Sequence, residues 1–149
     1  MVQLNLPTYA VDLKKIDGKI HIFDAIRKKY LVLTPEEWVR QHFLQYLISH
    51  KGFVASLMSL EAGLKYNQRQ KRTDLVVYDQ RMRPLLLVEC KAPSVKITDK
   101  TFQQIITYYK EVNAQYMAVT NGLEHYFFQI QHGQIHFLED IPDYPSLKA

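Results

Sequence analysis

The 149-residue chain has a single cysteine, so no disulfide can form within it. A lone thiol of this kind is normal in a reducing compartment. The sequence also has only 5 glycines and 6 prolines, while 47% of its residues are hydrophobic. This composition excludes collagen-like and disordered chains. At this length we expect one domain with a core of its own.

Long apolar runs are absent as well. No stretch approaches the roughly 20 residues that a transmembrane helix needs. The first residues, M-V-Q-L-N-L-P, have neither the basic region nor the apolar region of a signal peptide. We therefore expect a soluble, cytoplasmic protein without a membrane partner.

Excess charge of either sign is small, because the net charge is only +4. A mildly basic chain is compatible with a polyanionic partner but does not require one. Basic residues form two clusters, at 27–29 and at 69–72. Each cluster has the alternative interpretation of a solvated edge. The second cluster is the more informative, since it directly precedes Thr73 and Asp74.

The first half of the chain predicts a β-rich lead-in followed by a helix. Asp17-Gly18 favours a tight hairpin turn, and residues 30–33 can add a short extended piece. Thr34 can cap a helix that has Pro35 at its first position and Glu37 in a capping-box arrangement. We expect this helix to run to about residue 50, where Gly52 ends it. Residues 54–64 are compatible with a short helix or a strand.

The second half predicts mostly strands. We expect strands at 73–78, 85–90, 114–120, 126–130 and 134–137, with a second long helix from Thr98 or Thr101 to about residue 112. Residues 85–88 are apolar on both faces, which is typical of a central, covered strand. The chain is thus expected to form a single unit (lead-in 1–33, core 34–130, hairpin and tail 131–149). Its fold class is α/β (α+β), with a mixed central β-sheet flanked by helices and an N-terminal β-hairpin.

Two acids and a lysine occupy the pair of strands joined by the polar turn at 79–84. Side chains alternate along a strand, so Glu89 and Lys91 share a face while Cys90 points to the other. A hairpin would bring Asp74 back beside this pair. The pattern therefore predicts two carboxylates that converge on one point, with an ammonium next to them.

Such a set suits metal-assisted cleavage of a phosphodiester. Asp74 and Glu89 would bind Mg²⁺, with the backbone carbonyl of Cys90 as a third oxygen. The metal would activate water, and Lys91 would stabilise the charge that develops on phosphorus. The competing interpretation is a surface ion pair, worth about 0–1 kcal/mol. The Cys90 thiol itself is expected to lie in the core.

The motifs R-T-D-L-V-V-Y-D and P-L-L-L-V-E-C-K-A-P, followed by Gln104-I-I-T-Tyr108, resemble the PD-(D/E)XK nuclease superfamily. More narrowly, the chain is similar to the nuclease domain at the N-terminus of type I restriction enzyme R subunits. T-P-E-E-W-V-R-Q at 34–41 and V-T-N-G at 119–122 extend this likeness to about residues 34–130. Position 73 holds threonine where the family motif has proline.

The resemblance implies a restriction-endonuclease-like fold, a Mg²⁺ requirement with Mn²⁺ as a possible substitute, and DNA as the substrate. It gives Asp74, Glu89 and Lys91 the metal-binding and catalytic roles. Gln104 and Tyr108, one helical turn apart, would line the site and orient the catalytic groups or the DNA backbone.

A glutamate on a helix usually completes sites of this family. Glu36 is the first candidate, because it lies on the same helix side as the apolar stripe of Val39, Phe43 and Leu47. Glu37 is the second. Candidates for contacts with DNA are basic residues close to the site along the chain: Arg69, Lys71, Arg72 and Lys96.

The sequence contains no G-x-x-x-x-G-K-[ST] loop, so it has no ATP-driven motor of its own. Partners are therefore expected to be DNA and other restriction-system subunits. A homodimer is a further possibility, because cutting both strands usually takes two sites. The alternative function is a non-catalytic module that binds nucleic acid or a partner protein on the same fold. RNA or a repair intermediate stays open as the substrate.

Overall fold

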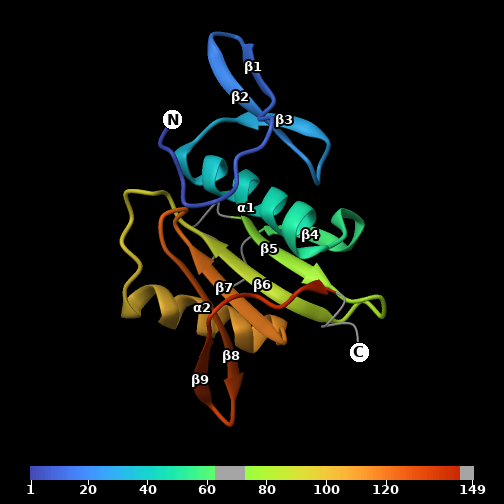
Figure 1. The fold of residues 1–149 in the computed structure, drawn as a ribbon, viewed down its shortest axis with the longest axis vertical. Coiled ribbons are helices and arrows are strands. Elements are labelled where there is room, and N and C mark those ends of the chain that lie inside the picture. Colours follow the sequence, from blue (N-terminus) through green and yellow to red (C-terminus); the bar gives the residue numbers. More distant parts are fainter. Residues whose placement is uncertain (63–72, 145–149) are drawn as a thin grey trace.

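Two β-sheets and two long helices make up the part of the chain that the structure describes (Figure 1). The computed structural model describes residues 1–62 and 73–144, apart from the side chains of residues 61, 62, 73 and 74. One sheet has three strands and the other has six. The predicted mixed α+β architecture is confirmed. No helix within the described ranges is long and apolar enough to cross a membrane.

The N-terminal sheet consists of β1 (Leu13–Ile16), β2 (Lys19–Asp24) and β3 (Lys29–Val32), all antiparallel. Asp17 and Gly18 form the turn between β1 and β2 with φ angles of 50° and 79°. The predicted hairpin is therefore confirmed. It is larger than expected, because the short extended piece after it pairs with β2 as a third strand.

Helix α1 (Pro35–Lys51) begins and ends at the predicted signals. Thr34 Oγ1 accepts a hydrogen bond from the Glu37 backbone N–H at 3.0 Å. Gly52 adopts a left-handed conformation with φ 75° and donates its N–H to the carbonyl of Leu47. Such a terminus favours glycine, since a side chain is disfavoured at positive φ.

The six-stranded sheet runs in the order β4-β5-β6-β7-β8-β9. Its strands are β4 (Met58–Ala62), β5 (Thr73–Tyr78), β6 (Pro84–Cys90), β7 (Tyr116–Thr120), β8 (His125–Gln131) and β9 (Gln134–Leu138). Only the β6–β7 pair is parallel among the described strands, and α2 (Asp99–Val112) makes the crossover between them. The N-cap of α2 is Thr98, the earlier of the two predicted starts.

Several strands differ from the prediction by one residue at an end, and two segments differ by more. The ambiguous segment 54–64 contains both alternatives, a short 3-10 helix at Ala55–Leu57 followed directly by β4. Strand β7 begins two residues later than expected. Asn113 ends α2 in a left-handed conformation with φ 56°, so the two residues after it are used to reach the sheet.

The helices cover opposite faces of the six-stranded sheet (Figure 1). On the α1 side, Leu86, Val88 and Cys90 of β6 pack with the helix core. On the α2 side, Leu87 packs with Ile105 and other apolar residues. Residues 85–88 are all at most 2% exposed, which confirms the prediction of a central strand covered on both sides. The end of this strand is where the candidate residues lie.

Candidate active site

Glu89 lies at the C-terminal end of β6, with its side chain on the α2 face. It pairs across the sheet with Val119, whose side chain belongs to the α2-side core. Glu89 is only 1% exposed. A carboxylate so deeply buried in an apolar sheet is costly unless charged or polar groups compensate it. We therefore expect charged or polar side chains close to Glu89 at this end of β6.

Lys91 supplies a positive charge next to that carboxylate. Lys91 Nζ lies 4.0 Å from Glu89 Oε2, and it donates a hydrogen bond to Gln104 Oε1 at 3.5 Å. The Lys91 backbone N–H donates to the carbonyl of Thr120 at 2.8 Å, which fixes the chain just beyond β6. The structure thus brings together three of the predicted site residues, from a strand end and from α2.

Tyr108 lies one turn after Gln104 on the same helix. The ring is 1% exposed and belongs to the core between α2 and the sheet. Its packing anchors the part of α2 that presents Gln104 to Lys91.

The backbone register places position 74 opposite Glu89. Strand β5 pairs with β6 in antiparallel fashion, and Leu75 is the partner of Val88. Residue 74 precedes Leu75 and Glu89 follows Val88, so the two acids stand at facing positions of the two strands. The side chain of Asp74 lies outside the described residues, and its role as a ligand stays a prediction.

Cys90 points to the α1 side, as strand alternation predicts, and packs in the core there. Burial raises the pKa of its thiol to about 12, while the Arg40 guanidinium lowers it and Glu89, Glu36 and Glu37 raise it further. Charged groups from β6 and from α1 therefore all influence the pKa of the buried Cys90 thiol. This places both candidate glutamates of α1 near the end of β6.

Arg40 is the residue that the sequence analysis missed. The side chain is almost fully buried and forms an ion pair with Glu36 at 3.1 Å and a second one with Glu37. The signal was present in E-E-W-V-R, because residues three and four apart lie on one side of a helix. Glu36 is the first candidate from its position on the helix, yet the structure buries Glu37 more deeply, with its side chain 14% exposed against 35% for Glu36.

The loop after β7 lies beside Lys91. Asn121 is 3% exposed, and its Oδ1 accepts hydrogen bonds from the backbone N–H groups of Leu123 and Glu124 at 2.9 and 2.8 Å. Its Nδ2 donates to the carbonyl of Val95 at 2.9 Å. The V-T-N-G motif thereby ties the segment between β6 and α2 to the end of β7.

The candidates for DNA contact divide into two groups. Lys96 is exposed in the segment between β6 and α2, close in the chain to Lys91. The others, Arg69, Lys71 and Arg72, lie outside the described residues. The side chains that the structure describes, which do not include Asp74, contain no group of three or more His, Cys, Asp or Glu suited to a metal ion.

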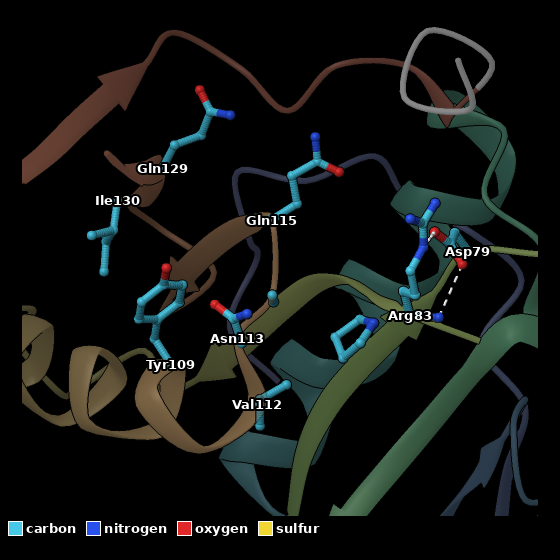
Figure 2. A pocket seen from close by; sticks show the side chains of 10 residues that line it. Asp79, Arg83, Tyr109, Val112, Asn113, Gln115, Gln129 and Ile130 are labelled. Carbon is cyan, nitrogen blue, oxygen red and sulfur yellow. Dashed lines mark hydrogen bonds and ion pairs between the residues drawn. The ribbon is translucent and has the colours of Figure 1, made fainter. Parts of the chain in front are cut away.

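A hollow of about 620 Å³ lies at the other end of the sheet (Figure 2). It is lined by residues from the start of β6, the end of α2 and β8, among them Pro84, Val112 and Gln129. Arg83 there donates to Asp79 at 2.9 Å, so its charge is already paired. None of the residues lining this hollow is a predicted site residue, and it is separate from the Glu89 region.

Comparison with known proteins identifies the family of the chain. A family model described as type I restriction enzyme R protein N terminus matches residues 35–142. That range begins at the first residue of α1 and includes the whole six-stranded sheet. No curated protein matches the chain. The family match confirms the resemblance inferred from the motifs, and the chain belongs to the family of type I restriction enzyme R protein N-terminal domains.

Proposed function

We propose that this chain is a metal-dependent endonuclease domain that hydrolyses phosphodiester bonds in DNA. The observation that carries the proposal is the buried Glu89 carboxylate, with the Lys91 ammonium 4.0 Å away and Gln104 bound to that ammonium. Position 74 faces Glu89 across the β5–β6 pair. Membership of the restriction-enzyme family supports the same function.

The donor atoms fit a hard cation such as Mg²⁺, or Mn²⁺ in its place. Asp74 and Glu89 would hold it through carboxylate oxygens, and the Cys90 carbonyl would be a third oxygen ligand. Such a bound cation lowers the pKa of water and neutralises charge on the phosphoryl oxygens. The buried position of Glu89 supports this assignment, because charge attraction is screened least where water is excluded.

The remaining residues would stabilise the charge that develops on phosphorus and position the groups around it. Lys91 would place its positive charge against the negative oxygens that develop on phosphorus. Gln104 accepts a hydrogen bond from that ammonium, so it would keep the charge directed at the scissile group. Glu36 or Glu37 would complete the site from α1, where Arg40 holds both carboxylates near the end of β6.

Binding partners follow from the same assignment. DNA would be the substrate, contacted by Lys96 and by the basic residues Arg69, Lys71 and Arg72. These 149 residues contain no phosphate-binding loop of an ATPase, and other restriction-system subunits would be further partners. Two copies would supply the two sites needed to cut both strands.

The test is a cleavage assay with purified protein, Mg²⁺ or Mn²⁺, and single-stranded and double-stranded DNA. Glu89→Gln and Lys91→Ala should each reduce cleavage by about 100-fold or more, the size expected for losing one stabilising group in an active site. Glu111→Gln is the matched control, because Glu111 is exposed near the end of α2. Equal activity in the wild type and all variants would indicate a contaminating nuclease and end the proposal.

The same experiment distinguishes the alternative function. Binding of DNA that weakens with salt, without hydrolysis and without uptake of Mg²⁺ in calorimetry, would identify a non-catalytic binding module. Cleavage of RNA in preference to DNA would keep the chemistry and change the substrate.

A further inference from the structure

The positive charge of the chain is concentrated in the N-terminal sheet. Residues 11–33 contain six Lys and Arg against three Asp, which amounts to +3 of the total net charge of +4. Residues 35–142, the part matched by the family, contain twelve basic and eleven acidic residues and thus carry only +1. The basic element therefore lies outside the range that the family model matches.

This sheet has an inner and an outer face. Ile22 and Asp24 of β2 are fully buried on the inner side. His21, which precedes Ile22, points outward and pairs with Lys14, while Lys19 pairs with Ile16 on the same outer face. The β1–β2 hairpin extends away from α1 and from the six-stranded sheet (Figure 1). Lys14 and Lys19 are therefore presented to solvent on a protruding surface.

Most of the acids in this segment are already engaged. Asp12 accepts the Tyr30 hydroxyl at 2.9 Å from each carboxylate oxygen. Asp24 is buried and pairs with Arg27 at 3.5 Å. Within the described part of the chain, none of the exposed lysines of the sheet and of its β2–β3 turn forms an ion pair with a carboxylate. These lysines are Lys14, Lys15, Lys19 and Lys29 of the strands and Lys28 of the turn.

On the outer face, one of these lysines, Lys14, lies over an aromatic ring. The rings of Phe23 and Tyr30 meet edge to face, with their centroids 5.3 Å apart. Lys14 Nζ lies 5.4 Å from the centroid of the Tyr30 ring. A cation held over an aromatic face loses less freedom when it binds a ligand, since it is already partly ordered.

We propose that the outer face of the N-terminal sheet, centred on Lys14 and Lys19, binds the phosphate backbone of duplex DNA outside the cleavage site. Lys14 and Lys19 are diagonal neighbours on the paired strands β1 and β2, and such neighbours lie about 7–8 Å apart. The flexible lysine side chains can match this separation to phosphates of one DNA strand, which are spaced about 3.4 Å along the helix axis. Contacts of this kind add affinity and orientation but read no sequence.

The choice of DNA as the polyanion rests on the proposed function, whereas the charge and exposure of the surface do not. An acidic protein and a second copy of the chain are the other possible occupants. The second copy is the weaker candidate, because a surface of net positive charge repels its own duplicate.

Binding is tested without metal, so that no cleavage takes place. Fluorescence anisotropy of a labelled DNA duplex is measured in EDTA between about 50 and 200 mM salt with the full chain. The variant Lys14→Gln/Lys19→Gln is compared with Arg81→Gln/Lys110→Gln. This control removes the same charge from exposed positions on other elements.

Loss of two phosphate contacts should lower the slope of log affinity against log salt by about 2 and weaken binding about tenfold. The control should leave the slope unchanged and the affinity within about twofold of the wild type. Circular dichroism and thermal unfolding confirm that each variant is folded. The proposal is overturned if the wild type does not bind duplex DNA, if the test variant keeps the wild-type slope, or if both variants weaken equally. A change of oligomeric state in the test variant alone would assign the surface to a second copy.

The two proposals fail separately. If the slope changes as expected but no DNA is cleaved in Mg²⁺ or Mn²⁺, the DNA-binding surface stands and the nuclease proposal falls. If Glu89→Gln abolishes cleavage while the slope is unchanged, the nuclease stands and the outer face has another use.

Discussion

Arg40 connects the first turn of α1 with the end of β6. Its buried guanidinium binds Glu36 and Glu37 and lowers the pKa of the Cys90 thiol. Taking an ion out of water is costly, and two carboxylates offset that cost here. The two ion pairs of Arg40 therefore fix the positions of both candidate glutamates.

Replacement of Arg40 should destabilise the fold. We expect Arg40→Ala to lower the free energy of unfolding by about 2–4 kcal/mol, because it leaves the Glu37 carboxylate poorly compensated and opens a gap in the packing. Urea denaturation measures this loss. Arg81→Ala, at an exposed turn position, should stay within about 0.5 kcal/mol. A loss in Arg40→Ala no larger than in this control would show that the ion pairs contribute nothing.

Strand alternation was sufficient to predict that Glu89 and Lys91 share a face. It could not predict the role of Arg40, because charged residues on a helix are solvated in most proteins. The burial of Arg40 depends on β6 lying directly beneath it. Glu37 is more buried than Glu36, and it also accepts a hydrogen bond from Gln41 Nε2 at 3.3 Å.

The Cys90 thiol should be inert in the folded protein. It is 3% exposed, and burial raises its pKa to about 12, so the reactive thiolate is scarce at neutral pH. Iodoacetamide at pH 8 should label the native protein at least about tenfold more slowly than the urea-unfolded chain, because the thiolate is the nucleophile. Mass spectrometry follows the labelling. Equal rates in both states would mean that this end of β6 opens readily.

Among the elements, α1 depends on its N-terminal cap. Thr34 Oγ1 accepts the Glu37 N–H at 3.0 Å, and loss of such a cap costs about 1 kcal/mol. Thr34→Ala should therefore lower the free energy of unfolding by about that amount, whereas Thr34→Ser should retain most of it. Equilibrium urea unfolding of the three proteins compares them. An alanine variant as stable as the wild type would show that solvent satisfies this N–H equally well.

Elements whose ends are set by capping or turn residues could be predicted from the sequence. Strands that form only because a distant strand pairs with them could not. The ends of α1 follow from Thr34 and Gly52, and the first hairpin follows from Asp17-Gly18. By contrast, β3 becomes a strand because β2 is available to pair with it. Segment 54–64 carries no local preference strong enough to decide, and β5 provides the partner for its strand half.

At the scale of the whole molecule, α1 lies between two sheets (Figure 1). The six-stranded sheet holds the candidate site, and the N-terminal sheet holds most of the excess positive charge. The parallel β6–β7 pair could not be read from local sequence, since it requires the α2 crossover. That crossover brings Gln104 to Lys91, so the topology itself assembles part of the site.

The segment after β9 contacts the end of α1 through two acids that pair with Lys51: Asp140 at 2.8 Å and Asp143 at 3.6 Å. Asp140 accepts hydrogen bonds from Lys51 Nζ at 2.8 Å and from the Tyr46 hydroxyl at 3.0 Å. Burial would raise the pKa of Asp140, but the hydrogen bonds from Lys51, Tyr46 and the Ile141 N–H outweigh it and hold this pKa below its ordinary value. The Asp140 carboxylate, which is protonated in acid, thereby links the segment after β9 to Tyr46 and Lys51 of α1.

Stability from this contact should therefore depend on pH. Because the pKa of Asp140 is lower in the folded state, its contribution is complete above the unfolded pKa of about 3.9. It is lost as the pH falls through the folded value. Asp140→Asn should lower the free energy of unfolding by up to about 1 kcal/mol at pH 7, since the carboxylate is half exposed. The difference from the wild type should shrink as the pH falls through the folded value, because the protonated carboxyl no longer carries the charge that Lys51 pairs with.

A double-mutant cycle with Lys51→Met isolates the pair from other effects of the substitution. In the Lys51→Met background, Asp140→Asn should cost less at pH 7 than in the wild type, because the principal donor to the carboxylate is gone. Urea unfolding of the four proteins at pH 7 and at about pH 2 provides the comparison. If Asp140→Asn costs the same at both pH values and in both backgrounds, the carboxylate charge plays no part in attaching the segment after β9 to α1.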